Sequence, residues 1–211
     1  MIDATHQINA VRRQVGSCTL EEGEARTITI GQTYDAPIDD VWDACTNIER
    51  IPCWLMPITG DLRVGGTYQL VGNASGTVTS CDPPNAFAAT WEYGGEVSWI
   101  EVRLARESAE RTRLDIEHIA KVGDSKWAEF GPGAVGVGWD MMVLGLALHL
   151  STGASNDPEE SMAWAMSEDG AKFMMQSNDL WRDANIAAGA DRAVAEEAAA
   201  RTIAAYTAPP E

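Results

Sequence analysis

Five strand-like runs follow one another between residues 61 and 120, with no helical pattern between them. The clearest, RTRLDIEHIA, alternates Leu114, Ile116 and His118 with charged residues, which is typical of a strand with one buried face. Strands joined at hairpin distance pair antiparallel, whereas parallel strands need long crossover connections. The pattern therefore predicts an antiparallel sheet with His118 on its apolar side. The runs are residues 61–72, 75–84, 86–93, 97–107 and 111–120.

Helical patterns flank these strands. An earlier strand, RTITIGQTY, is followed by a helix in DAPIDDVWDACTN, where we expect Asp35 to cap and Pro37 to occupy the first position, and by a short helix in IERIPCWL. Residues 61–72 are expected to form one strand, with Leu62 and Val64 on its apolar face. Because the helices must cover a sheet face, the fold class is α+β: a curved antiparallel sheet around a long helix, with space for a cavity between them.

The long helix is predicted in the apolar run GWDMMVLGLALHL, residues 138–150. Its 13 residues would span about 20 Å, less than the roughly 30 Å of a bilayer core, so we expect no membrane span. Asp140 falls in the expected first turn, where capping explains it, and His149 falls near the end, where a cation suits the helix dipole. The preceding glycine-rich EFGPGAVGVG lacks the Lys-Ser or Lys-Thr pair of a phosphate loop, and we expect a flexible loop beside the cavity.

The charge balance narrows the choice of partners. The chain has 15 basic and 32 acidic residues, and no stretch gathers Lys and Arg. Nucleic acid and anionic membrane surfaces are therefore not expected as partners. The scattered acidic residues indicate a cytoplasmic protein with a negative surface.

The cysteines give no sign of a metal site or of disulfides. Cys18, Cys45, Cys53 and Cys81 include no CxxC pair, and none clusters with a histidine. We expect reduced, mostly buried thiols, with Cys45 packed as a small hydrophobe. The N-terminal residues lack the apolar stretch of a secretory signal, and no metal or cofactor is predicted.

The last third of the chain is predicted to be helical. Asn156 or Asp157 caps a first helix with Pro158 at its start, a second helix begins near Ser167, and an alanine-rich third ends near Tyr206. We expect this tail to pack on the domain or to form a homodimer surface. The predicted organisation is an N-terminal segment (1–24), a sheet-and-helix domain (25–152) and a helical C-terminal extension (153–211).

Several motifs in order resemble a known superfamily. YDAPIDDVWDACTNIERIPCW, GDLRVGGTYQL, GTVTSCDPPNAFAATWEY and LDIEHIA, followed by the long helix, are similar to the SRPBCC superfamily with its START-like or helix-grip fold. More narrowly, they resemble its bacterial branch of homologues of the activator of the heat-shock protein 90 ATPase. The superfamily includes polyketide cyclases, aromatases and lipid-transfer domains. The resemblance implies a hydrophobic cavity between the sheet and the long helix.

Inward residues of the sheet and the helix are the candidate ligand contacts. His118 could be a polar anchor or general base in the cavity, or a core histidine hydrogen-bonded to a backbone carbonyl. No nucleophile elbow, HExxH motif, carboxylate pair or dinucleotide fingerprint is present. The candidates are Tyr68, Trp91, Ile100, Val102, Leu114, Ile116, His118, Met142 and Leu146.

Three functions are compatible with these observations. The first is binding of a small hydrophobic or amphipathic molecule in the cavity. The second is a cyclase- or aromatase-like enzyme in which His118 moves a proton. The third, suggested by the name of the branch, is a co-chaperone-like interaction protein. Whether the chain is an enzyme stays open.

Overall fold

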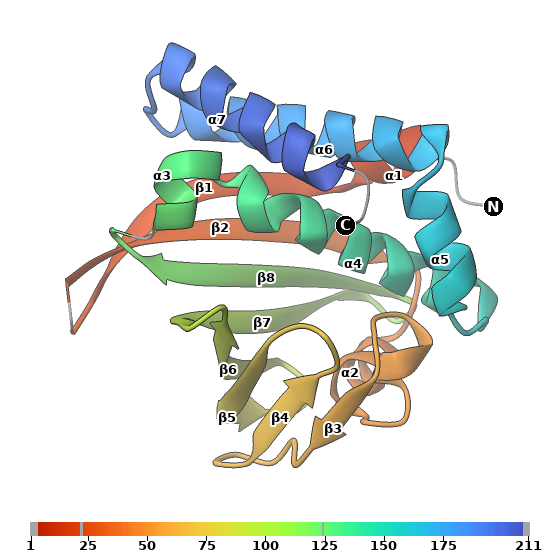
Figure 1. The fold of residues 1–211 in the computed structure, drawn as a ribbon. Coiled ribbons are helices and arrows are strands. Elements are labelled where there is room, and N and C mark those ends of the chain that lie inside the picture. The colour runs from red at the N-terminus through yellow and green to blue at the C-terminus, as the bar shows by residue number, and fades with distance from the viewer. Residues whose placement is uncertain (1–3, 22, 124, 209–211) are drawn as a thin grey trace. The chain divides into compact units, whose positions relative to one another are not determined.

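The computed structural model describes the chain except residues 1–3, 22, 124 and 209–211 (Figure 1). Helices and strands follow in the order α1 (Ala4–Ala10), β1 (Arg12–Leu20), β2 (Gly23–Tyr34), α2 (Ile38–Thr46), η1 (Ile51–Cys53), β3 (Ile58–Gly60), β4 (Thr67–Leu70), β5 (Ser75–Asp82), β6 (Ala86–Tyr93), β7 (Glu96–Ser108), β8 (Arg111–Lys121), α3 (Ser125–Phe130), α4 (Gly133–Thr152), α5 (Pro158–Ala165), α6 (Glu168–Ala187) and α7 (Arg192–Tyr206).

The strands form one sheet in the order β1-β2-β8-β7-β6-β5-β4-β3. Every pair from β3 to β8 along the chain is antiparallel. This meander confirms the predicted α+β class. It also fixes which side chains share a face, because residues directly opposite one another in neighbouring strands point to the same side.

The first 24 residues contain two elements that the sequence patterns did not reveal. Helix α1 precedes β1, which lies beside β2 at the edge of the sheet. Strand β1 reads RRQVGSCTL, with polar residues on both faces and none of its residues fully buried. The alternation of hydrophobic and polar residues that identifies a half-buried strand is therefore missing.

Two local predictions before β5 are wrong. Strand β4 begins only at Thr67, so Leu62 lies in an irregular segment and Val64, which is 58% exposed, lies in the turn that follows it. The turn ends at Gly65-Gly66, and Gly65 has a φ of +84°, a conformation that favours glycine. Pro37 is the N-cap residue of α2 and not its first helical residue, and Asp35 does not cap it.

Helix α4 begins at Gly133, so the glycine-rich segment expected to be a flexible loop is largely helical. The helix has 20 residues and spans about 30 Å, which overturns the length argument against a membrane span. By length and composition it could cross a membrane, as can many core helices. Its burial indicates a core helix, since 56% of its most apolar stretch is buried and so are both Asp140 and His149.

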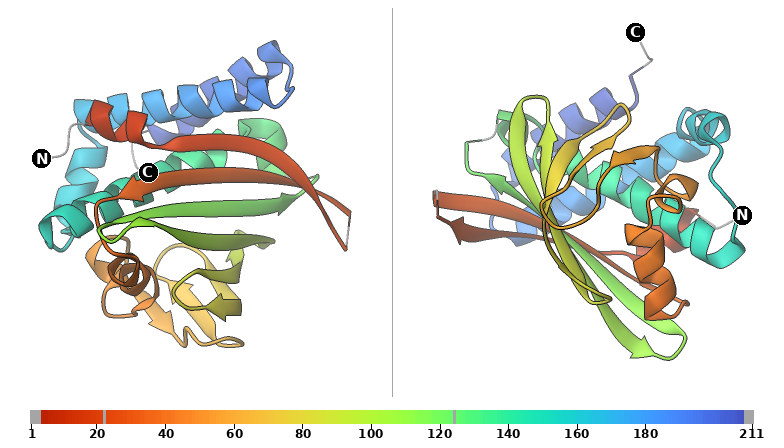
Figure 2. Two further views of the ribbon diagram at one scale, coloured as in Figure 1. Left: turned by 180° about the vertical axis from the view of Figure 1, so that it is seen from behind. Right: turned by 90° about the horizontal axis from the view of Figure 1, so that it is seen from below.

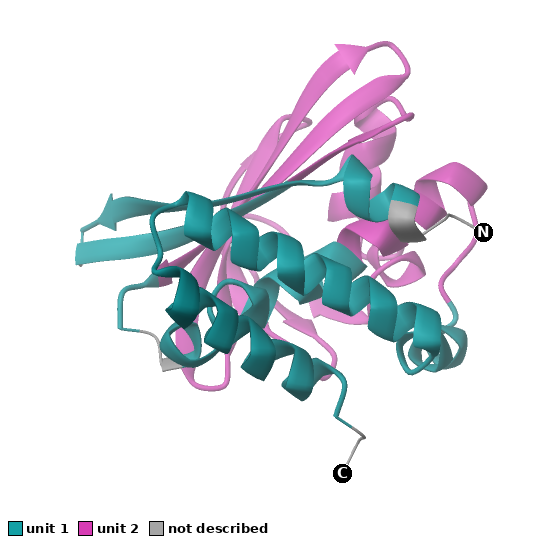
Figure 3. Ribbon diagram, turned by 90° about the horizontal axis from the view of Figure 1, so that it is seen from above, with its two compact units in different colours: residues 1–30, 121–141, 157–211 teal, residues 31–120, 142–156 magenta. Residues whose placement is uncertain are grey.

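The chain divides into two compact units, which Figure 3 shows in different colours. Unit 1 comprises residues 1–30, 121–141 and 157–211, and unit 2 comprises residues 31–120 and 142–156. Strands β2 and β8 and helix α4 each continue from one unit into the other. Because both units are built from interleaved segments, the boundaries predicted near residues 24 and 152 remain predictions.

Unit 1 holds the C-terminal helices against the beginning of the chain. Helix α6 packs along β1, as Figure 2 shows from behind, and α7 packs on α6 and α3. The predicted starts of α5 and α6 are confirmed, because the side chains of Asp157 and Ser167 accept hydrogen bonds from first-turn amides of these helices. Asp191 caps α7 in the same way.

The helical glycines of unit 1 allow α6 to approach α4 closely. A Cβ atom at Gly136 would lie 2.5 Å from the ring of Trp181, and one at Gly133 would lie 2.6 Å from Oδ1 of Asn178. Both glycines therefore stand where any larger residue would collide with α6. The physical reason for this glycine-rich segment is helix packing.

Candidate functional site

One face of the unit 2 sheet carries the strand residues predicted to contact a ligand. Ile100 lies opposite His118, Val102 opposite Ile116, and Leu104 opposite Leu114, so all six point to the same side. The registers of β4, β5 and β6 bring Tyr68 and Trp91 to that side as well. We call this side the inner face. All seven predicted strand residues lie on it: Tyr68, Trp91, Ile100, Val102, Leu114, Ile116 and His118.

The inner face also includes residues that the sequence patterns did not single out. Phe87 and Ala89 of β6 lie opposite Val102 and Ile100, and Ser98 of β7 lies opposite Trp91. The ring of Trp42 on α2 meets that of Phe87 edge-on, with 6.0 Å between the centroids. Helix α2 therefore covers part of this face. Small or polar residues such as Ala89 and Ser98 carry too weak a hydrophobic signal to be found from alternation alone.

His118 is the polar centre of this largely apolar surface. It is only 6% exposed, and its Nε2 lies 2.9 Å from the hydroxyl oxygen of Ser98. The Ser98 hydroxyl donates to the carbonyl of Trp91 at 3.0 Å, and the Trp91 ring meets the imidazole edge-on. The partner seen for Nε2 is thus a hydroxyl, where a backbone carbonyl was the alternative considered from the sequence.

The direction of these hydrogen bonds limits the chemistry of the pair. The Ser98 hydroxyl has a single hydrogen to donate, and its oxygen lies 3.0 Å from the Trp91 carbonyl oxygen and 2.9 Å from Nε2 of His118. When that hydrogen goes to the carbonyl, the Ser98 oxygen accepts from Nε2–H of His118, whereas a serine activated as a nucleophile would donate its hydrogen to the histidine. Competition from the Trp91 carbonyl thus disfavours a nucleophilic dyad and leaves a pair of oriented polar groups.

The second half of α4 supplies the two remaining predicted contacts. Leu146 is almost completely buried within the protein, whereas Met142 is half-buried. The neighbouring carbonyl of Val143 accepts a hydrogen bond of 3.3 Å from the hydroxyl of Tyr34. Burial raises the pKa of Tyr34 well above its ordinary value, with a smaller contribution from Cys45. Tyr34 is therefore a neutral donor that holds this half of the helix.

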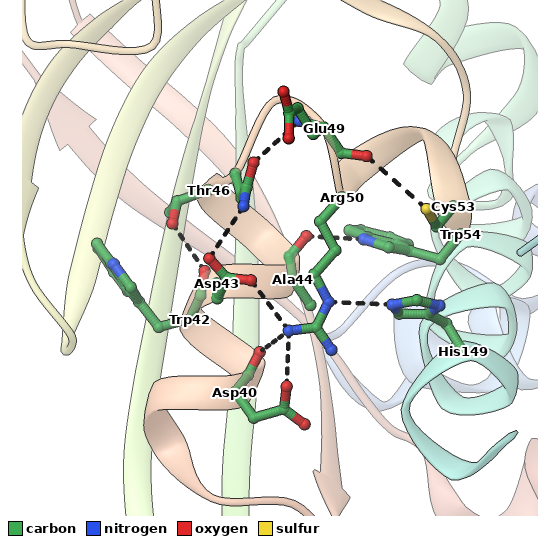
Figure 4. A network of polar contacts seen from close by, with 11 residues as sticks. Asp40, Trp42, Asp43, Ala44, Thr46, Glu49, Arg50, Cys53, Trp54 and His149 are labelled. Carbon is green, nitrogen blue, oxygen red and sulfur yellow. Dashed lines mark hydrogen bonds and ion pairs between the residues drawn. The ribbon is translucent and has the colours of Figure 1, made fainter. Parts of the chain in front are cut away.

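A polar network fastens the end of α4 to α2, and Figure 4 shows it at close range. The guanidinium of Arg50 lies between Asp40 and Asp43 of α2 and donates through Nε to Nε2 of His149 at 3.1 Å. Partial burial lowers the pKa of Arg50, but its hydrogen bonds to Asp40 and Asp43 outweigh that effect and raise it overall. No sequence motif indicated this network, since its members come from separate elements.

The same network fixes the state of His149. Its Nδ1 lies 2.9 Å from the carbonyl oxygen of Ala154, which can only accept, so Nδ1 carries the hydrogen. Nε2 is then the acceptor for Arg50, and the imidazole is neutral. The expectation of a cation at the helix end is therefore wrong, because the arginine already provides the positive charge.

In unit 1, Asp140 is the centre of a buried cluster and not a helix cap. It lies in the second turn of α4, is 1% exposed, and pairs with Arg13, whose side chain is 4% exposed. Arg13 donates to both carboxylate oxygens, at 2.9 and 2.5 Å. The Ser177 hydroxyl and the Trp181 indole also donate to it, at 2.6 and 2.9 Å. Four hydrogen bonds thus compensate for the buried charge.

The cysteines are less buried than expected. Cys18, Cys45 and Cys53 are partly exposed, Cys81 is exposed, and none of the four forms a disulfide. The protein surrounding the Cys45 thiol raises its pKa to about 12 by desolvation, although Arg50 opposes the shift. Desolvation therefore disfavours the thiolate of Cys45, which is the reactive form of the side chain. Among the residues that the structure describes, no group of three His, Cys, Asp or Glu side chains could hold a metal ion.

We expect alkylation to reveal the raised pKa of Cys45. At pH 8 a thiol with a pKa of about 12 has on the order of a thousandth of the thiolate of an unperturbed one. Iodoacetamide should therefore modify Cys45 far more slowly in the folded protein than in urea, as measured by mass spectrometry of its peptide. Equal rates in the two conditions would show that the thiol is not desolvated.

Comparisons with known proteins identify the family. The model of the activator of Hsp90 ATPase homologue 1-like proteins matches residues 35–151. The crystal structure of CalU16 from Micromonospora echinospora is 35% identical, covers 83% of this chain and 98% of its own, and has a TM-score of 0.65. Its solution structure is 34% identical, covers 85% of this chain and 97% of its own, and has a TM-score of 0.72. No curated protein matches the chain.

Two more distant structures share the fold alone. PFC0360w, an HSP90 activator from Plasmodium falciparum, is 19% identical, covers 62% of this chain and 99% of its own, and has a TM-score of 0.51. DynU16, from the dynemicin biosynthetic locus, is 21% identical, covers 61% of this chain and 48% of its own, and has a TM-score of 0.53. These likenesses confirm the helix-grip type of α+β fold that the motifs implied. The chain belongs to the family of activator of Hsp90 ATPase homologue 1-like proteins, within the SRPBCC superfamily.

Proposed function

We propose that this protein binds a small hydrophobic or amphipathic molecule against the inner face of unit 2. The observation that carries the proposal is the hydrogen-bonded pair of the buried His118 and the half-buried Ser98, set among the apolar side chains of five adjacent strands. A surface of this composition suits a ligand that is mostly apolar and carries one or two polar atoms. The residues proposed to contact the ligand are those predicted from the sequence, together with Ala89 and Ser98.

Each part of the surface has its own role in the proposed binding. Apolar side chains such as Ile100 and Val102 would gain about 25 cal/mol for each Å² removed from water. His118 and Ser98 would exchange their mutual hydrogen bond for bonds to a ligand oxygen, which fixes the orientation of the ligand. Met142 on α4 has a flexible thioether side chain that adapts to ligands of different shape.

The net charge and the cysteines support our proposals for the partners and the cellular location of the protein. A net charge of −17 opposes binding to nucleic acid and to anionic membranes, so neither has a role in the proposal. Four cysteines that form no disulfide support a cytoplasmic location. The chain could act as a monomer or as a homodimer with the same inner face.

The cyclase- or aromatase-like alternative would use the same surface. The observation in its favour is the oriented imidazole of His118, which could carry a proton between atoms of a bound substrate. A co-chaperone role has less support, because the likeness to the Plasmodium HSP90 activator, at 19% identity, extends only to the fold.

The binding proposal is tested with a matched pair of substitutions on β6. Ala89 is buried on the inner face, whereas Ala88 lies on the opposite face and is partly exposed. Ala89→Phe should lower the affinity for the uncharged fluorescent probe N-phenyl-1-naphthylamine at least about tenfold by filling the site, and Ala88→Phe should leave it within about twofold. Probe fluorescence during titration measures both.

The controls separate loss of the site from loss of folding. Thermal unfolding of each variant shows whether the domain is intact, and His118→Phe provides a second variant that keeps an aromatic ring at this position but removes the polar centre. His118→Phe should bind the probe normally and bind long-chain alcohols more weakly. Absence of probe binding to the unmodified protein, or equal effects of the two alanine substitutions, would refute the proposal.

A further inference from the structure

The face of the unit 2 sheet opposite the inner face contains a polar depression. It has a volume of about 400 Å³ and lies over β3, β4, β5 and β6. Of the nine residues that line it, Tyr68 alone was among the predicted ligand contacts. Its polar side chains belong to Thr59, Thr67, Gln69, Ser75, Thr77 and Glu92.

The strand register arranges these side chains as two rows. Thr59 lies opposite Gln69, Gln69 opposite Ser75, and Ser75 opposite Glu92, so one row crosses four strands. Thr67 lies opposite Thr77 in the second row. Neighbouring strands are about 4.8 Å apart, and same-face residues on one strand are about 6.7 Å apart. Hydroxyl, amide and carboxylate groups therefore form a regular grid.

At the depression, the backbones of β5 and β6 form hydrogen bonds with side chains. The amide of Thr77 donates to the hydroxyl oxygen of Thr90 at 2.8 Å, and the carbonyl of Thr90 accepts from the hydroxyl of Tyr68 at 2.7 Å. Gly76 permits this arrangement, because a Cβ there would collide with the Thr90 carbonyl and the Tyr68 ring. Burial raises the pKa of Tyr68, with a smaller contribution from Glu92, so it remains a donor.

Glu92 provides the acceptor of the depression. Its carboxylate receives a hydrogen bond of 3.2 Å from the hydroxyl of Thr90 and is otherwise exposed to solvent. None of the nine lining residues is Lys, Arg or His. Phosphate, sulfate and carboxylate ligands would therefore meet a carboxylate without a compensating cation, which excludes them.

We propose that this depression binds a saccharide, at a site on the side of the sheet opposite the inner face that has only Tyr68 in common with it. Threonine and serine hydroxyls both donate and accept hydrogen bonds, which matches a ligand that presents several hydroxyls. The Gln69 side chain adds an acceptor through its carbonyl oxygen, because its amide nitrogen already donates to backbone carbonyls of residues 70, 73 and 74. The Glu92 carboxylate would accept a hydrogen bond from one of the ligand hydroxyls. Because the acceptor is charged, this bond is stronger than one between neutral groups. The volume, about 400 Å³, lies within the usual range for sites that hold a small molecule.

The test is a titration of the ¹⁵N-labelled protein with the methyl glycosides of glucose, galactose, mannose and N-acetylglucosamine, and with maltose. At least one should bind in the millimolar range. It should shift the amide signals of Gln69, Gly76 and Thr77 and leave those of Ile116 and His118 unchanged. Glu92→Gln and Thr77→Val should each weaken that binding about tenfold.

A similar hydroxyl and carboxylate pair elsewhere in unit 2 gives the control. Thr33 on β2 donates to Glu107 at 3.2 Å, the same distance as between Thr90 and Glu92, outside the depression. Thr33→Val and Glu107→Gln should leave the affinity unchanged. The proposal is overturned if no saccharide of the panel shifts these amides, or if the site and control variants behave alike. N-phenyl-1-naphthylamine binding reports on the inner face independently, so failure of one site is distinguishable from failure of the other.

Discussion

Asp140→Ala is expected to destabilise the protein by about 3–5 kcal/mol, a large part of the roughly 5–15 kcal/mol that stabilises a typical domain. The substitution leaves the guanidinium of Arg13 buried, at 4% exposure, without its carboxylate. It also removes the acceptor of Ser177 and of the Trp181 indole. An uncompensated buried cation costs far more than the pair contributes, so the loss exceeds that of any exposed ion pair.

Urea unfolding followed by circular dichroism measures this effect, and the chain offers a matched control. Asp179 pairs with Arg182 at 2.7 Å on the exposed side of α6, and its side chain is 58% exposed. Asp179→Ala should change the free energy of unfolding by less than about 1 kcal/mol. The double variant Arg13→Met with Asp140→Leu should recover much of the loss, because it removes both charges. Similar effects of Asp140→Ala and Asp179→Ala would contradict the role given to the cluster.

The sequence could not have revealed this cluster, for a physical reason. Arg13, Ser177 and Trp181 lie 127, 37 and 41 residues from Asp140, so no local pattern connects them. An aspartate close to an apparent helix start is ordinarily a cap, and the apolar run that predicted the helix begins at Gly138. The true start at Gly133 depends on packing against α6, which is a tertiary effect.

The inner face was predictable because apolar and polar residues alternate along a strand that has one buried face. Alternation alone placed Ile100, Val102, Ile116 and His118 on the apolar side, and the register agrees. Ser98, the partner of His118, is on the neighbouring strand and follows only from the pairing of β7 with β8. A sequence pattern thus shows the direction of a side chain along its own strand, whereas the structure is needed to find what that side chain meets.

The polar depression on the opposite face of the sheet was even harder to predict from the sequence. Threonine is common on the solvent side of strands, so Thr67 and Thr77 look like ordinary surface residues. Two features distinguish them: the alignment of four short strands, and the glycine at position 76, where a larger residue would collide with the neighbouring strand. Neither feature has a local sequence signal, since both arise from contacts across strands.

The same substitution at two glycines of α4 should change the free energy of unfolding in opposite directions. Gly136→Ala is expected to destabilise the protein by about 1–3 kcal/mol, because the new methyl group would lie 2.5 Å from the ring of the fully buried Trp181. Gly138→Ala places its methyl group 3.4 Å from the Tyr206 hydroxyl, an ordinary contact. This variant should gain up to about 1 kcal/mol, since alanine favours a helix more than glycine does.

The comparison isolates packing from helix propensity, because both substitutions add the same group to the same helix. Urea unfolding of the two variants gives the sign of each change in the free energy of unfolding. If the dependence of that free energy on urea concentration is unchanged, the effect does not arise in the unfolded state. If Gly136→Ala were as stable as Gly138→Ala, α6 would have to lie farther from α4 than it does here. Opposite signs would establish that the glycine-rich segment is retained for contact with Trp181, and that the helix includes it despite the low helix propensity of glycine.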